Sequence, residues 1–186
     1  MSCDSEASAR AFAAKLITQF EPSMRRTSIS GAIAHAAGLF AGNGYSGLRR
    51  VIDVSGDGPN NEGGPVAAAR NAAVASGIVI NGLPLMTREG MGSQWTLPDL
   101  DHYYTDCVIG GAAAFVVPVT DWSEFPGAVR RKLVQELVGP GAVPDGAPSA
   151  VPMDLPVVRA QYLSRTDGPY DCLIGEKLWR EMFERN

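Results

Sequence analysis

A short apolar run that ends in polar residues is the feature that most constrains this chain. Residues 49–61 read Arg-Arg-Val-Ile-Asp-Val-Ser-Gly-Asp-Gly-Pro-Asn-Asn. An apolar run that gives way to acidic, hydroxyl, glycine and amide residues is typical of a buried parallel strand that delivers ligands to the carboxyl end of an α/β sheet. Asp53, Ser55 and Asp57 offer oxygen donors, with no His or Cys among them. Such donors favour Mg²⁺, Mn²⁺ or Ca²⁺ over zinc.

Predicted strands alternate with predicted helices along most of the chain. The apolar runs predict strands at 48–54, 78–85 and 115–119. Helical spacing and capping residues predict helices at 4–20, 29–40, 65–77, 99–108 and 121–138, with a further short helix at 176–185. The alternation predicts an α/β fold in which helices flank a parallel sheet of about three strands. We expect a domain over residues 1–139, a Pro/Gly/Ala-rich linker over 140–157 and a tail over 158–186.

Composition and charge exclude several classes of protein. The chain has 186 residues, of which 45% are hydrophobic, so it is long enough for one domain with a substantial core. Its net charge is −4 and its basic residues are scattered, which argues against a nucleic-acid partner. The sequence contains no run of eighteen apolar residues, so we expect no transmembrane segment. The first twenty residues do not resemble a signal peptide, so we expect the chain as written to stay in the cytoplasm.

The three cysteines, Cys3, Cys107 and Cys172, lie far apart in the sequence. Their spacing fits no zinc motif, and an odd number cannot be fully paired within the chain. Two alternatives follow from the count alone. Either two of the cysteines pair in an oxidising compartment, or all three remain free thiols.

The Asp53-x-Ser55-x-Asp57 spacing has more than one interpretation. An EF-hand loop is excluded because it requires Glu at its twelfth position, where this chain has Gly64. A phosphoryl-transfer aspartate would need a downstream lysine, and the nearby basic residue is Arg70. The structural alternative is a strand-end turn whose polar side chains satisfy backbone groups. An α/β hydrolase or phosphatase that uses Asp53 or Asp57 stays open as the alternative function.

Four segments carry a resemblance to a known family. They are residues 50–61, already quoted in part, then 65–70 (Pro-Val-Ala-Ala-Ala-Arg), 80–84 (Ile-Asn-Gly-Leu-Pro) and 104–111 (Tyr-Thr-Asp-Cys-Val-Ile-Gly-Gly). Over about residues 4–138 the chain resembles an uncharacterised bacterial family of the von Willebrand factor A-like superfamily, which is catalogued only as a domain of unknown function. The resemblance implies a non-enzymatic module that binds a protein or another ligand.

The resemblance also implies a metal site. Domains of this superfamily hold a metal-ion-dependent adhesion site with an Asp-x-Ser-x-Ser after the first strand, a loop Thr and an Asp after the fourth strand. In this chain Thr27 resembles the loop threonine and Asp57 the fourth-strand aspartate, which leaves Asp53 and Ser55 as weaker, supporting candidates. With so few of the usual ligands, we expect binding of Mg²⁺, or of Mn²⁺ or Ca²⁺, to be weak or absent in the isolated chain. A second alignment makes Asp53-x-Ser55-x-Asp57 itself a degenerate Asp-x-Ser-x-Ser.

The resemblance further implies that the chain is the C-terminal half of a doubly wound, Rossmann-like sheet of order 3-2-1-4-5-6. The 26 residues before Thr27 are too few for the first three strands. One edge of the strand at 51–54 is then expected to be unpaired, which predicts self-association, pairing with a protein partner, or poor stability. Alternatively, the chain is a structural remnant with no activity of its own. Family members generally begin with a secretion signal, so the resemblance implies a secreted or periplasmic setting if the true N-terminus lies upstream.

Overall fold

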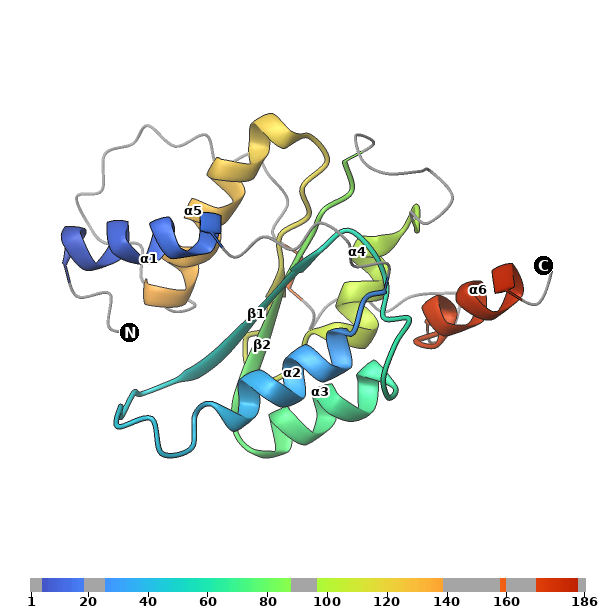
Figure 1. The fold of residues 1–186 in the computed structure, drawn as a ribbon, viewed down its shortest axis with the longest axis horizontal. Coiled ribbons are helices and arrows are strands. Elements are labelled where there is room, and N and C mark those ends of the chain that lie inside the picture. Colours follow the sequence, from blue (N-terminus) through green and yellow to red (C-terminus); the bar gives the residue numbers. More distant parts are fainter. Residues whose placement is uncertain (1–4, 19–25, 88–96, 139–157, 160–169, 184–186) are drawn as a thin grey trace.

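The computed structural model describes residues 5–18, 26–87, 97–138, 158–159 and 170–183 (Figure 1). These residues contain a sheet of order β1-β2-β3-β4, formed by Arg50–Gly56, Ile78–Pro84, Phe115–Val116 and Val158–Arg159. The first three strands are parallel, and β4 pairs antiparallel with β3. The predicted α/β fold with a three-stranded parallel sheet is therefore confirmed, whereas the short β4 was not predicted.

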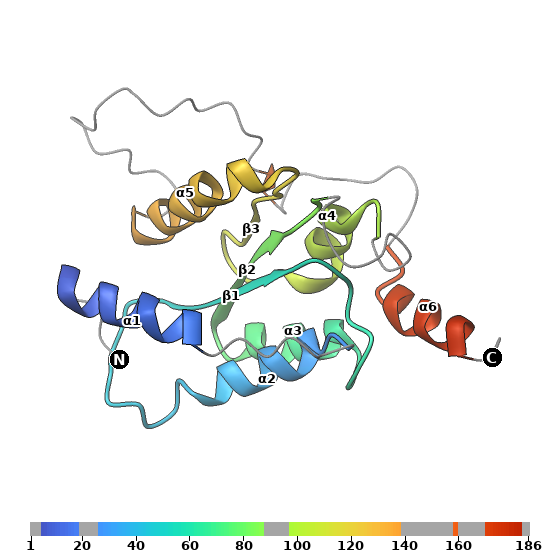
Figure 2. The same ribbon diagram turned by 45° about the horizontal axis from the view of Figure 1, so that its top comes forward.

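Helices cover both faces of this sheet. Figure 2 shows α2 (Ile29–Gly38) and α3 (Val66–Ala75) together on one side of the strands and α5 (Phe125–Val138) on the other side. The remaining helices and helical turns lie near the two ends of the chain or follow β2 or β3 in the sequence. The helices are α1 (Glu6–Thr18), α2 (Ile29–Gly38), α3 (Val66–Ala75), α4 (Leu100–Tyr103), a π-helical turn (Tyr104–Val108), a 3-10 turn (Trp122–Glu124), α5 (Phe125–Val138) and α6 (Ile174–Phe183). None of the helices in the described part of the chain is long and apolar enough to cross a membrane.

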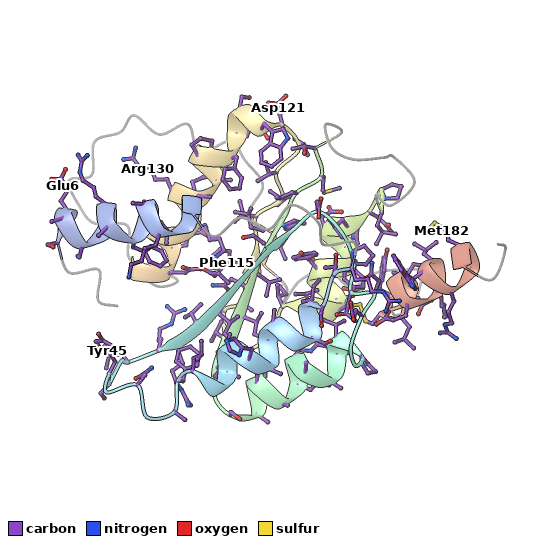
Figure 3. The ribbon with its side chains drawn as sticks, viewed as in Figure 1. Glu6, Tyr45, Phe115, Asp121, Arg130 and Met182 are labelled. Carbon is purple, nitrogen blue, oxygen red and sulfur yellow. A yellow bond between two sulfur atoms is a disulfide. The ribbon has the colours of Figure 1, made fainter. Side chains whose placement is uncertain are left out.

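The alternating side chains of β1 separate two apolar clusters. Ile52 and Val54 are buried with Ile33 of α2 and Val66 of α3 in the larger cluster. The smaller cluster lies beneath α5 and contains Leu83, Phe115, Val117, Val119 and Ala128; Figure 3 labels Phe115 near the centre of the molecule. β2 is thus buried on both faces, as a continuous apolar strand leads one to expect, whereas β1 alternates between buried and exposed residues.

Strand bounds differ slightly from those predicted from the sequence. β1 begins and ends two residues later than predicted, because Ser55 and Gly56 continue the pairing with β2 opposite Leu83 and Pro84. Only two residues of the predicted strand at 115–119 form β3. Backbone hydrogen bonds nevertheless continue along this segment, from Val119 N to the Pro84 carbonyl at 2.9 Å. Ser55 and Gly56 remain extended because β2 supplies partners for pairing with their backbone. Their residue types alone do not indicate this pairing.

Most side chains of the first helix are exposed over residues 6–15, where the structure describes them. The sequence predicted a helix over 4–20 with an apolar face, and the structure has α1 over Glu6–Thr18. Ala11, Phe12, Ala13 and Ala14 are all exposed, and Phe12 retains 45% of its accessible surface.

The C-terminal segment packs against the core and is linked to it covalently. Cys107 in the π-helical turn forms a disulfide with Cys172, just before α6, with the two Cα atoms 5.4 Å apart. The sequence had left this pairing open, and Cys3 lies outside the described residues. Gly175 lies so close to the backbone of Asn60 that a Cβ atom there would come within 2.1 Å of the Asn60 carbonyl oxygen. The predicted linker over 140–157 lies outside the described residues.

Loss of the disulfide is expected to destabilise the domain. The bond joins residues 65 positions apart, and a cross-link over such a loop restricts the unfolded chain. We expect replacement of both Cys107 and Cys172 by Ala to lower the free energy of unfolding by about 2–4 kcal/mol, measured by urea denaturation under oxidising conditions. A reductant should have the same effect on the wild-type chain and little effect on the double variant. Equal stability of the two oxidised proteins would contradict the prediction.

Candidate functional site

Two loops that carry predicted metal ligands are joined at the carboxyl end of β1. The Thr27 amide donates to the Asn61 side-chain oxygen at 2.7 Å. The Thr27 carbonyl accepts from the Asn61 amide at 2.9 Å and from the Glu62 amide at 3.2 Å. Asn61 and Glu62 belong to the β1–α3 loop, which opens with Asp57. Although 30 residues apart in sequence, Thr27 and Asp57 thus belong to two connected segments at one end of the sheet.

The donors that these segments present are suited to a hard cation but are few. Thr27 is half-buried, whereas Asp57 is exposed in the turn directly after β1. A hydroxyl and a carboxylate are the kinds of ligand that Mg²⁺ prefers. Across the described ranges, however, no cluster of three or more His, Cys, Asp or Glu residues is arranged to hold a metal ion. The donor set therefore fits part of a magnesium site, and water or another molecule would have to supply the remaining ligands.

Asn60 holds the β1–α3 loop in place. The residue has no exposed surface. Its side-chain oxygen accepts from the Ser30 amide at 3.0 Å, and its amide nitrogen donates to the Gly64 carbonyl at 3.2 Å and to Glu176 Oε1 at 2.7 Å. Its backbone amide donates to the Tyr103 hydroxyl at 3.1 Å. One buried residue thus connects the β1–α3 loop with α2, α4 and α6, so the position of the Asp57 turn depends on these three helices.

The sequence had indicated Asn60 and Asn61 only as turn residues. Their adjacent amides after Asp57-Gly58-Pro59 were the visible signal, but nothing in the spacing identified their partners. Those partners lie up to 116 positions away, as in the contact with Glu176. A contact of this kind becomes visible only when the chain is folded.

A buried tyrosine lies beneath the Asp57 turn. The Tyr104 hydroxyl is fully buried and has no hydrogen-bond partner among the described residues. It packs against Gly56, where an added Cβ atom would be 2.9 Å from the Tyr104 oxygen. Burial raises the pKa of Tyr104, and the nearby Tyr103 and Asp57 raise this pKa further. Tyr104 therefore stays neutral and keeps a hydroxyl hydrogen next to the turn.

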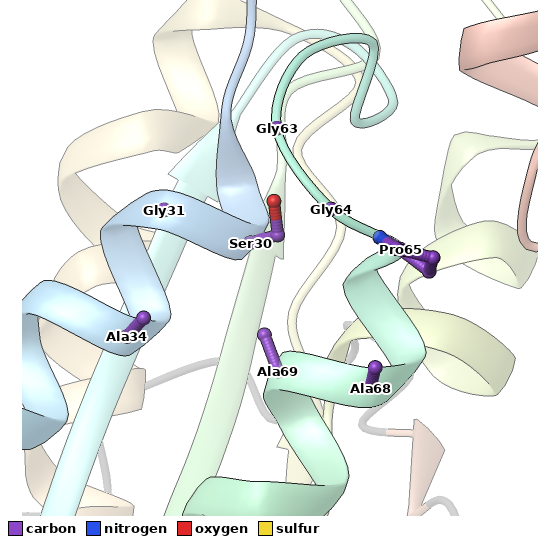
Figure 4. Close-up of a pocket in the computed structure, with 8 residues that line it drawn as sticks. All are labelled: Ser30, Gly31, Ala34, Gly63, Gly64, Pro65, Ala68 and Ala69. Atoms are coloured by element: carbon purple, nitrogen blue, oxygen red, sulfur yellow. The ribbon is translucent and has the colours of Figure 1, made fainter.

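A pocket lies beside this site, between the amino ends of α2 and α3 (Figure 4). Its volume is about 290 Å³, and its lining is formed by Ser30, Gly31, Ala34, Gly63, Gly64, Pro65, Ala68 and Ala69. The side chains are small and mostly apolar. Ser30 carries the one hydroxyl among them, and this hydroxyl donates to the Glu62 carbonyl at 3.4 Å. The pocket is therefore a small, mostly apolar cavity beside the loops, and none of its lining residues is a charged ligand.

Asp53 faces α5, where it forms part of a different cluster. Its carboxylate pairs with the ammonium of Lys132, which is 4% exposed. Lys132 also lies 3.0 Å from Glu136 Oε1, which accepts from the Asn81 side-chain amide at 2.9 Å. The Asn81 oxygen in turn accepts from the Phe115 amide at 3.2 Å. The structure therefore couples Asp53 to α5, and Ser55, two residues further along β1, remains exposed.

Burial and hydrogen bonding together shift the pKa values of the two carboxyl groups in this cluster in opposite directions. Burial raises the pKa of Asp53 to about 6, helped by the hydrogen bond with Glu136 and opposed by Lys132. Burial also pushes the pKa of Glu136 upward, but hydrogen bonds with Asp53, Lys132 and Asn81 outweigh it and lower that pKa. As the pH falls, Asp53 is therefore the carboxyl of the pair that takes up the first proton.

The Asp53 proton makes stability depend on pH. Because the folded-state pKa is about 6 and the ordinary value is 3.8, the folded chain binds this proton more tightly than the unfolded chain. The stability that it contributes is fully present below about pH 4 and is lost as the pH rises through about 6. We expect Asp53→Asn to remove this loss and to stabilise the chain at pH 7.5 by about 1 kcal/mol or less, since the carboxylate is partly exposed. Denaturant titrations at pH 5 and 7.5 measure the change. Equal pH dependence in both proteins would contradict the assignment.

The three side-chain hydrogen bonds of Asn60 predict a large effect for removal of its carboxamide. We expect Asn60→Ala to lower the free energy of unfolding by about 2–3 kcal/mol, because it leaves buried donors and acceptors without partners. Asn43→Ala is the matched control: Asn43 also bonds to backbone groups, at Leu39 and Tyr45, but is exposed. Its effect should stay within about 0.5 kcal/mol. Thermal melts of both variants measure the difference, and similar losses would refute a special role for Asn60.

The fold and the site define an α/β protein with a small parallel sheet and polar loops at the sheet's carboxyl end. The family described as "Protein of unknown function (DUF1194)" matches residues 1–141, which is more than half of the chain. The chain belongs to this family. No curated protein and no solved structure matches the chain.

Proposed function

We propose that this chain is a non-enzymatic binding module of the von Willebrand factor A type, with an incomplete metal-ion-dependent adhesion site. The observation that carries the proposal is the hydrogen-bonded connection between the Thr27 segment and the Asn61–Glu62 part of the Asp57 loop. Parallel strands deliver ligand-binding loops at their carboxyl ends, and this connection lies at that end of β1. Thr27 and Asp57 are the proposed metal ligands. Tyr104 supports the turn from below.

The proposed metal is Mg²⁺, with Mn²⁺ or Ca²⁺ as substitutes. A cation held by one hydroxyl and one carboxylate keeps most of its water ligands, so its affinity is low. A bound partner that contributes an acidic side chain would complete the coordination and gain affinity from it. The metal would therefore act as a bridge between the module and the molecule that it binds.

The proposal predicts weak metal binding that depends on Asp57. We expect calorimetric titration with Mg²⁺ or Mn²⁺ to give a dissociation constant on the order of 1 mM. Asp57→Ala should abolish the signal, whereas Asp101→Ala, a control on α4, should leave it unchanged. Submicromolar binding by the wild-type chain, or binding that survives Asp57→Ala, would count against the proposal.

A second candidate function is hydrolysis, and the Asp53 cluster is the observation that favours it. A partly exposed carboxyl group with a pKa of about 6 beside a lysine is suited to acid–base catalysis. In this alternative Asp53 or Asp57 belongs to an α/β hydrolase or phosphatase. The variants Asp57→Ala and Asp53→Ala together separate the two functions. A module loses metal or ligand binding with Asp57→Ala, whereas an enzyme loses turnover with one of the two variants and keeps its affinity for the substrate.

The free edge of β1 is the proposed surface for a protein partner or for self-association. β1 is the terminal strand of the sheet in the part of the chain that the structure describes. An unpaired edge presents backbone donors and acceptors that another strand can pair with. Figure 1 shows this strand at the margin of the sheet, with α2 packed beside it.

A further inference from the structure

We propose that a second copy of this chain pairs with the free edge of β1, antiparallel and about a two-fold axis at Asp53. This inference rests on the proposed binding role of that edge and names its occupant. It follows from the hydrogen-bonding direction of β1, from the charges at the two ends of the strand and from the exposed residues beside it.

Backbone geometry identifies the residues of β1 that face outward. The Gly56 carbonyl accepts from the Leu85 amide at 2.8 Å, so the backbone groups of Gly56 point toward β2. The N–H and C=O of a strand residue point to the same side, and this side alternates along the strand. Val51, Asp53 and Ser55 therefore direct their backbone groups to the free edge. Asp53 is the middle residue of the seven in β1.

A two-fold axis at Asp53 aligns all of these groups. In an antiparallel pair, outward residues exchange hydrogen bonds with the outward residues opposite them. Asp53 then pairs with Asp53 of the other copy, and Val51 pairs with Ser55 in both directions. The apolar residues also match, since Ile52 lies opposite Val54 on the face that α2 and α3 cover.

The charges flanking β1 are complementary in the same register. Arg49 precedes the strand and Asp57 follows it, and both are exposed. The axis at Asp53 places Arg49 of each copy opposite Asp57 of the other, which creates two ion pairs. Leu48, which is completely exposed in this structure, lies next to Arg49 and gains cover from the second copy. Tyr45, which lies in the connection between α2 and β1 and is labelled in Figure 3, is 65% exposed.

The centre of the interface is sensitive to pH. The two Asp53 side chains lie side by side at the axis, and the charged groups that face each of them are Lys132 and Glu136 of its own α5. With Asp53 ionised, each cluster carries one net negative charge, and like charges placed opposite each other on paired strands are destabilising. Protonation of Asp53 makes each cluster neutral. The pairing therefore strengthens as the pH falls through about 6.

Light scattering coupled to size-exclusion chromatography tests this pairing with the full chain. We expect a dimer at pH 5 that weakens at pH 7.5, and an Asp53→Asn variant that is dimeric at both values. Val51→Pro removes an outward N–H without removing a bond to β2, so it should weaken the dimer by on the order of tenfold or more. Val51→Ala is the matched control: it loses the same side chain but keeps the N–H, and should remain dimeric.

A charge exchange tests the register with variants at exposed positions. Arg49→Asp should weaken the dimer by on the order of tenfold, because two ion pairs become two repulsive pairs. The double variant Arg49→Asp/Asp57→Arg should restore it. A monomer at both pH values, or a dimer unaffected by Val51→Pro and by Arg49→Asp, would overturn the inference. Magnesium titration of the monomeric Val51→Pro chain tests the proposed metal site separately, so that failure of one proposal is distinguished from failure of the other.

Discussion

The buried carboxamide of Asn60 is the interaction on which the rest of this end of the molecule depends. An Asn side chain has two donor hydrogens and an accepting oxygen, and here each type of group is used in a site with no exposed surface. Its partners come from segments before and after it in the chain. Because an unpaired polar group is costly in such surroundings, α2, α4 and α6 must be present together for the loop to adopt this conformation. The Asp57 turn therefore depends on α6 as well as on the sheet.

The disulfide reinforces the same arrangement. Cys107 follows Tyr103, which bonds to the β1–α3 loop, and Tyr104, which packs against the end of β1. Cys172 precedes the helix that supplies Glu176. Tyr170 adds a hydrogen bond to Asp99 at 2.9 Å and packs edge-on against Tyr103. The C-terminal segment thus contacts the core at several points within a few residues of the bond. The part of the chain that the family match covers ends at residue 141, so these contacts come from outside it.

The two faces of β1 have different chemistry, and this difference organises the proposed functions. Apolar residues on one face anchor α2 and α3, which carry the Thr27 and Asp57 loops at their amino ends. The other face carries Asp53, whose charge is balanced by Lys132 in a partly buried cluster under α5. The proposed metal ligands and the Asp53 cluster are therefore close in sequence but contact different helices. Among the described residues, β1 is also the terminal strand of the sheet.

The sequence by itself determined the class of fold, since strand and helix periodicity depend on local spacing that burial then enforces. It also indicated the polar end of β1 and its oxygen donors. It did not determine that Asp53 pairs with Lys132, 79 positions away, instead of lying with Thr27 and Asp57. The cysteine pairing, the role of Asn60 and the orphaned Tyr104 hydroxyl likewise became visible only in the tertiary structure. The physical reason is common to all of them: hydrogen bonds, ion pairs and disulfides join groups by distance in space, and segments far apart in the chain leave no local pattern that records which of them will meet.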